Sequence, residues 1–211
     1  MARLLEGSDA ATAIRTLRVR ALVVLAVPVG VFVGASGAVF RLLYDARYAG
    51  GGSIVALVGI GTWLNIVGMS YVVVALARGW PRWISYANGL KAITFAALAV
   101  PVHAAYGIQG IALLVATSEV VVSVVTGFGV RRLGMTSAGI DVGATLVMLA
   151  AAGLTYAAEG WLASALGSSW PGVILFGAAG ALALYAGAKR VSRDGTAEVA
   201  SAEPEARVVG S

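Results

Sequence analysis

Long apolar segments alternate with short polar connectors along most of the chain. The apolar segments cover residues 21–43, 53–77, 83–105, 107–130, 141–162 and 170–189. Each is about 20 residues or longer, which is the length that an α-helix needs to cross roughly 30 Å of hydrocarbon. A membrane β-barrel would show segments of about ten residues with alternating polarity, and the sequence lacks them. The pattern predicts an all-α integral membrane bundle of six transmembrane helices over residues 21–189.

The two ends of the chain differ from this apolar region. Residues 1–20 are polar and of mixed charge. The apolar segment that follows them is longer than the core of a secretory signal, so we expect a cytoplasmic amphipathic lead that is not cleaved. Residues 190–211 are rich in Ser, Glu and Arg and show no apolar periodicity. This composition is typical of a disordered tail.

The composition supports a membrane protein and argues against several kinds of chemistry. Hydrophobic residues make up 59% of the chain and charged residues 12%, about half the charged fraction of a soluble domain. The sequence has no cysteine and one histidine, which excludes thiolate chemistry and argues against a metal site. It has no Walker or dinucleotide-binding motif. We therefore expect a protein that is not an enzyme and that needs no cofactor, metal or nucleic acid.

Basic residues predict the topology. Of the 15 Lys and Arg residues, 12 fall on one side of the predicted membrane. They are Arg3, Arg15, Arg18, Arg20, Arg78, Arg82, Arg131, Arg132, Lys189, Arg190, Arg193 and Arg207. Because connectors rich in Lys and Arg stay in the cytoplasm, both termini are predicted to be cytoplasmic.

Two charged residues lie inside predicted helices. Lys91 is nine residues from Arg82, or roughly 13 Å deep, and Glu119 is twelve residues from Arg131, or roughly 18 Å deep. Charges at such depth usually face the interior of a bundle and mark a pathway. Lys91 and Glu119 could form a buried ion pair that fixes helix packing, or they could line a polar cavity.

Other polar residues in the segments have simpler explanations. Asn65 and Asn88 could form hydrogen bonds between helices or contact a ligand. Asp141 and Glu159 lie near the ends of one segment, so we expect them to reach solvent. The pairs Gly30-x-x-x-Gly34 and Gly139-x-x-x-Gly143 are typical of helices that approach closely.

Three stretches together resemble the C-terminal half of the polysaccharide-exporting flippases, members of the multidrug/oligosaccharidyl-lipid/polysaccharide superfamily. The stretches are ARLLEGSDAATAIRTLRVRALVVLAVPVG, RLLYDARYAGG and VPVHAAYGIQGIALLVATSEVVVSVV. The last carries a proline, a Gly-x-x-Gly and an intramembrane Ser-Glu, which here are Pro101, Gly107, Gly110, Ser118 and Glu119. The resemblance covers residues 2–132, and the last two segments fit by hydropathy alone.

The resemblance implies a function in polysaccharide biosynthesis. Members carry oligosaccharide linked to a polyprenyl diphosphate across the bacterial cytoplasmic membrane by alternating access, in a cavity between two lobes. This chain corresponds to one lobe, so a homodimer or another chain would supply the second. In the cavity, Lys91 would attract the diphosphate, with Glu119, Asn65 and Asn88 as further candidates for substrate contact. Met1 corresponds to a position in the middle of the chain in family members, which favours the interpretation that this chain is a truncated fragment.

Two alternatives stay open. A drug or metabolite cation antiporter of the same superfamily would use an unpaired carboxylate in the membrane. Whether Lys91 pairs with Glu119 therefore distinguishes a flippase from an antiporter. A non-transporting membrane scaffold would use the same charges only for stability.

Overall fold

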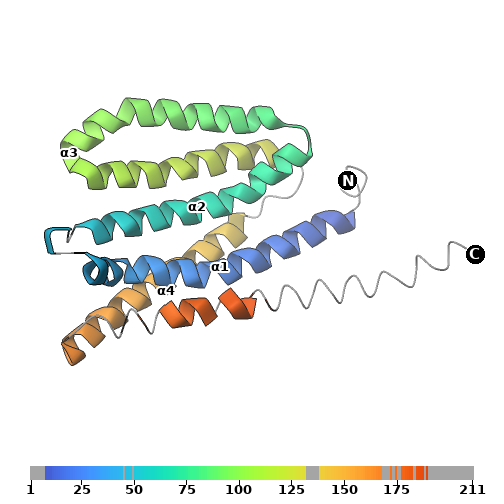
Figure 1. Cartoon of the computed structure of the whole chain (residues 1–211). Coiled ribbons are helices and arrows are strands. Elements are labelled where there is room, and N and C mark those ends of the chain that lie inside the picture. Colours follow the sequence, from blue (N-terminus) through green and yellow to red (C-terminus); the bar gives the residue numbers. More distant parts are fainter. Residues whose placement is uncertain are drawn as a thin grey trace, which may run out of the picture.

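The computed structural model describes residues 8–44, 46–48, 50–131 and 138–167, and residues 172, 174, 177–182, 184–187 and 189. Over these residues the secondary structure is helical (Figure 1). The elements in chain order are α1 (Ser8–Leu43), the 3-10 turn η2 (Ala46–Tyr48), α2 (Gly51–Ala77), α3 (Pro81–Val130) and α4 (Ala138–Leu166). The predicted all-α class is therefore confirmed.

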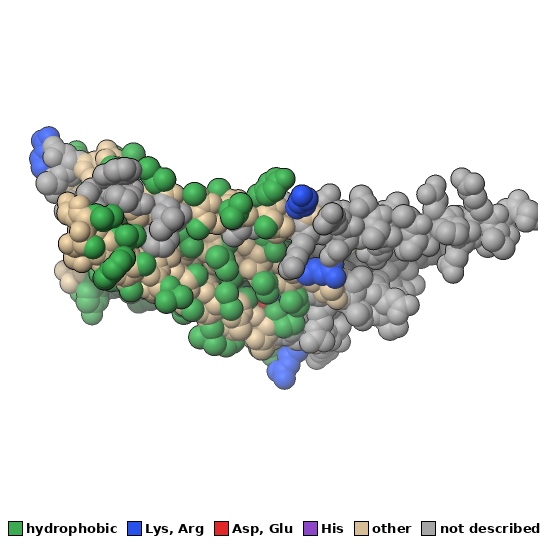
Figure 2. Space-filling view, turned by 90° about the horizontal axis from the view of Figure 1, so that it is seen from below, with side chains coloured by type: hydrophobic (Ala, Val, Ile, Leu, Met, Phe, Trp, Pro, Cys, Tyr) green, Lys and Arg blue, Asp and Glu red, His purple; other side chains and the backbone are tan. Residues whose placement is uncertain are grey.

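Four helices are long and apolar enough to cross a membrane. They are Arg18–Leu43 within α1, and α2, α3 and α4 over their whole lengths. On the face shown in Figure 2, apolar side chains cover the middle of the molecule, and the visible basic side chains lie towards its two ends. An apolar surface of this kind is costly in water but favourable in lipid, where a helix also satisfies its own backbone hydrogen bonds.

The helix α3 is a hairpin whose two halves are joined by a sharp reversal. Its 50 residues would extend about 75 Å if straight, more than twice the thickness of the hydrocarbon. Within α3, Gly107 has non-helical dihedral angles, with φ 60° and ψ −149°. The chain folds back there, so the two halves lie side by side (Figure 1), and the rings of Trp83 and Phe128 meet with centroids 6.2 Å apart.

The number of separate helices differs from the predicted six. The third and fourth predicted helices form the single element α3, because only one residue, Gly107, leaves the helical conformation between them. The sixth predicted helix, 170–189, is described only in part, with helical residues between Gly177 and Gly187, so the rest of this prediction lies outside the described residues. The described part of the chain thus has four α-helices and one 3-10 turn.

The helices α1 and α4 run parallel and pack closely through small residues. A Cβ atom added to Gly30 would lie 2.3 Å from the Met148 carbonyl oxygen, and one added to Gly34 would lie 2.3 Å from that of Ala152. The predicted close approach at Gly30 and Gly34 is confirmed. The close approach predicted at Gly139 and Gly143 is not found in the described part of the chain, because no neighbouring atom lies within 4 Å of a Cβ added to either residue.

Most of the described basic connectors lie at one end of the bundle. This end holds the first residues of α1 and α4, the last residues of α2, and both termini of α3 (Figure 1). Arg18, Arg78, Arg82 and Arg131 therefore belong to one end, as the topology prediction requires, and which side of the membrane this end faces stays a prediction. From Ser8 the predicted lead is continuous with α1. Residues 1–7 and the predicted tail, 190–211, lie outside the described residues.

The reversal in α3 should depend on glycine at residue 107. Positive φ combined with this ψ is a region that side chains with a Cβ avoid, at a cost of about 1–3 kcal/mol. We expect Gly107→Ala to lower the unfolding midpoint in mixed-micelle denaturation. The matched control is Gly143→Ala, at an open helical position of α4. Equal stability of the two variants would contradict the described reversal.

Candidate functional site

Three helical passes meet at a charged cluster in the middle of the apolar region. Lys91, in the first half of α3, donates a hydrogen bond from Nζ to Oε1 of Glu119 in the second half. Asn65 on α2 donates from Nδ2 to the other carboxylate oxygen, Oε2, at 3.1 Å. The structure thus brings together three of the four predicted site residues by direct contact, and Glu119 is the acceptor that joins them.

The cluster is an ion pair that also opens to a groove. The Glu119 side chain is 12% exposed and the Lys91 side chain 32% exposed. Lys91 lines a groove of about 400 Å³, with Asn88, Phe95 and Ser118 among its other lining residues. The ion pair left open by the sequence is therefore present, and Lys91, without Glu119, also lines a groove whose walls are mostly apolar.

The two intramembrane amides have different surroundings. Asn65 makes the helix-to-helix hydrogen bond expected of such a residue, because its partner Glu119 lies on α3. Asn88 precedes Lys91 by three residues, so it lies on the same face of α3 about one turn away, and it lines the groove. Within the described part of the chain, Asn88 makes no hydrogen bond to another side chain, which leaves its amide facing the groove.

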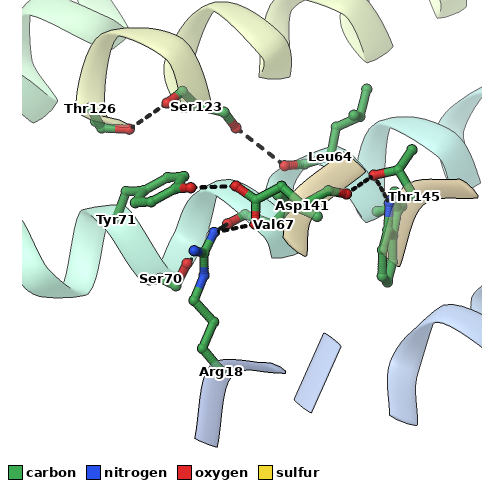
Figure 3. Close-up of polar contacts among 10 residues, drawn as sticks. Arg18, Leu64, Val67, Ser70, Tyr71, Ser123, Thr126, Asp141 and Thr145 are labelled. Atoms are coloured by element: carbon green, nitrogen blue, oxygen red, sulfur yellow. Dashed lines mark hydrogen bonds and ion pairs between the residues drawn. The ribbon is translucent and has the colours of Figure 1, made fainter. Parts of the chain in front are cut away.

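A second charged cluster joins α1, α2 and α4 (Figure 3). The Arg18 guanidinium lies 2.6 Å from Oδ1 of Asp141, and the Tyr71 hydroxyl donates to Oδ2 of the same carboxylate. The Arg18 guanidinium carbon is also 4.2 Å from the centroid of the Tyr71 ring, a cation–π distance. Thr145 donates to the Asp141 carbonyl at 2.7 Å and accepts from the indole of Trp63 at 3.1 Å.

A third ion pair joins the opposite ends of α1 and α4. Arg41 donates to Oε1 of Glu159. The Glu159 side chain is 6% exposed, whereas that of Arg41 is 55% exposed. The carboxylate is thus inside the bundle while most of the arginine stays at the surface, as long basic side chains do near the ends of membrane helices.

The expectation that Asp141 and Glu159 are solvated is wrong. Both carboxylates lie inside the bundle because α4 packs against α1, which supplies a cation at each end. A signal of this pairing is present in the sequence. Arg18 and Arg41 are about 35 Å apart along one helix, and Asp141 and Glu159 about 27 Å along another, so long arginine side chains can reach both carboxylates if the helices are parallel neighbours.

Comparisons with known protein families, with curated proteins and with solved structures find no match to this chain. The resemblance to the flippases is therefore carried by the three stretches of sequence described above. The functional roles of Lys91, Glu119, Asn65 and Asn88 are argued below from their contacts, burial and charge.

The Arg18–Asp141 pair should show strong energetic coupling. Removing one partner leaves a buried charge without its counter-ion, which costs about 3–5 kcal/mol, whereas neutralising both costs far less. We expect Arg18→Met and Asp141→Asn each to lower the unfolding midpoint in mixed micelles, and the double variant to be more stable than the sum of the single effects. Arg82→Met, at an exposed position, is the control. Additive single effects would contradict the buried pair.

Proposed function

We propose that this chain is one lobe of a transporter that moves oligosaccharide linked to a polyprenyl diphosphate across the bacterial cytoplasmic membrane. The observation that carries the proposal is the position of Lys91. Its ammonium group lies deep in an apolar helix and pairs with Glu119, yet the side chain is 32% exposed and lines a groove.

A cation in this position is suited to a diphosphate. A charge inside the membrane is costly, and the protein keeps it at a site that a ligand can reach. The groove walls are mostly apolar, as Phe95, Ala96 and Val115 show, so the local dielectric constant is lower than in water. Coulomb attraction between an ammonium and a strongly anionic diphosphate is correspondingly stronger there.

The contacts of Glu119 support reversible binding. When a diphosphate pairs with the Lys91 ammonium, the Glu119 carboxylate no longer has an ion-pair partner but keeps the hydrogen bond from Asn65. The amide limits the cost of the released carboxylate, and the carboxylate competes with the substrate for Lys91. A transport site needs this balance, because substrate that binds too tightly is not released on the other side.

The ion pairs favour an anionic substrate over the cation of an antiporter. A cation exporter is expected to present an unpaired carboxylate, which binds the cation or a proton. Among the membrane helices that the structure describes, the three acidic side chains each have a basic partner. They are Asp141, Glu159 and Glu119.

The lobe needs a partner to enclose a substrate. The Lys91 groove lies on the surface of the described part of the chain, and two-lobe transporters bind substrate where their repeats face each other. We therefore infer that a second lobe, from another copy or another chain, closes the groove. A non-transporting scaffold would use the Lys91–Glu119 pair only to hold the two halves of α3 together.

Two substitutions that remove both charges distinguish a transport function from a scaffold function. The single variant Lys91→Met leaves Glu119 buried and unpaired, so it lowers stability as well as any substrate affinity. The double variant Lys91→Met with Glu119→Gln removes both charges and should remain in the membrane at the wild-type amount. In cells whose polysaccharide export depends on this protein, we expect the double variant to lose export by more than about tenfold, since the lost charge-assisted contact between Lys91 and the diphosphate is worth about 1.5–3 kcal/mol.

The measurements are surface polysaccharide and the amount of the protein on an immunoblot of the membrane fraction. Lys91→Arg is the matched control, because it keeps a cation that can pair with Glu119 and bind phosphate, and it should keep part of the export. Unchanged export by the double variant would show that the pair only holds the helices together, as in a scaffold.

A further inference from the structure

A second groove, of about 730 Å³, lies between α4 and the second half of α3. Residues of α2 form its floor, from Leu64 to Tyr71, and its walls extend from Val120 to Arg131 on α3 and from Ala138 to Leu146 on α4. Its volume falls within the range of about 300–1,000 Å³ that is usual for ligand sites. It shares no lining residue with the Lys91 groove, which lies between the two halves of α3.

The length of this groove matches one leaflet of a bilayer. From Val120 to Arg131 the helix rises eleven residues, which is about 16 Å. Half of the hydrocarbon thickness of a bilayer is about 15 Å. Because Arg131 follows the last residue of α3, the groove starts at the end of the helix and extends to about the middle of the membrane.

The polarity of the groove changes along its length in the same way as that of a lipid. The inner part is lined by apolar or small side chains, including Val120, Val124 and Leu146. The outer part holds Arg131, with Tyr71 and Asp141 beside it. Asp141 is neutralised by Arg18, whereas Arg131 is exposed and forms no ion pair within the described part of the chain. The outer end therefore carries a net positive charge.

We propose that this groove binds a phospholipid with an anionic headgroup, its phosphate at Arg131 and one acyl chain along the apolar part. The depth of one leaflet and the Arg131 cation at the end of the helix are what select this occupant. A zwitterionic lipid would lack the net attraction to Arg131. Basic pockets between membrane helices on the cytoplasmic side are known to bind such headgroups, and the predicted topology places Arg131 on that side.

The lipid also has a structural consequence. Its acyl chain fills the space between α3 and α4 and covers the side of the cluster formed by Arg18, Tyr71 and Asp141, which keeps water away from these charges. This site does not depend on the substrate that the lobe carries, because Lys91 and the groove beside it take no part.

Native mass spectrometry of the full chain tests the headgroup. The protein is purified in a mild detergent with equal amounts of phosphatidylglycerol and phosphatidylcholine, and the bound lipids are measured. We expect wild-type protein to retain phosphatidylglycerol in preference. Arg131→Gln should lower the ratio of anionic to zwitterionic lipid about fivefold, the effect of one cationic side chain near anionic lipid. The control Arg82→Gln, at the same end of the bundle but outside the groove lining, should leave the ratio unchanged.

A second variant tests the acyl chain. A Cβ atom added to Gly127 would lie 3.7 Å from the Tyr71 ring, an ordinary contact, so the side chain of Gly127→Leu extends into the groove without displacing backbone. This variant should lose most of the bound lipid of both kinds. The matched control is Gly153→Leu, on an open face of α4.

Four results would overturn the proposal. The first is equal retention of the two lipids by wild-type protein. The second is lipid binding by Gly127→Leu at the level of Gly153→Leu. The third is a wild-type dimer that Gly127→Leu dissociates, because this would assign the groove to a second copy of the chain. Competition by inorganic phosphate alone would likewise show that Arg131 binds the anion without its lipid.

Discussion

The need to pair every charge that enters the membrane determines how these helices are arranged. An unpaired charge in hydrocarbon is costly, so each acidic side chain in the described membrane helices requires a basic neighbour. Two of the three pairs hold α1 parallel to α4, one at each end, and the third joins the two halves of α3. The pairs are Arg18–Asp141, Arg41–Glu159 and Lys91–Glu119. Between the first two pairs, Gly30 and Gly34 bring the backbones of α1 and α4 into contact.

The three pairs serve different purposes because they differ in what else can reach them. Arg18 and Asp141 are both largely buried, at 8% and 16% exposure, and share the Tyr71 hydroxyl, so their main effect is on stability. Lys91 is more exposed than Arg18 and lines a groove, which supports the proposal that a ligand exchanges at the Lys91–Glu119 pair. An anionic ligand is the natural competitor for a lysine whose carboxylate has a second hydrogen-bond partner.

Hydropathy predicts the helices well because each apolar segment satisfies its backbone locally, whatever its neighbours are. The break near Gly107 and the comparable depths of Lys91 and Glu119 follow from spacing along one antiparallel hairpin, so they too can be predicted. The environments of Asp141 and Glu159 could not be predicted, since their contacts with Arg18 and Arg41 cross 123 and 118 residues of sequence. The matching spacing of the two arginines becomes informative only once α1 and α4 are known to be parallel neighbours. Periodicity within one helix does not tell which distant helix lies beside it.

Access of water to the Lys91 groove is the most direct test of the account. The chain has no cysteine, so single cysteines can be introduced without removing others. A membrane-impermeant anionic methanethiosulfonate reagent, added to both sides of the membrane, reacts only where a thiolate forms in water. The account predicts rapid modification of Asn88→Cys, slowed by a polyprenyl diphosphate, and no modification of Ile93→Cys, which is 67% exposed on another face of α3. Equal lack of reaction at the two positions would contradict it, because the groove would then be filled with lipid.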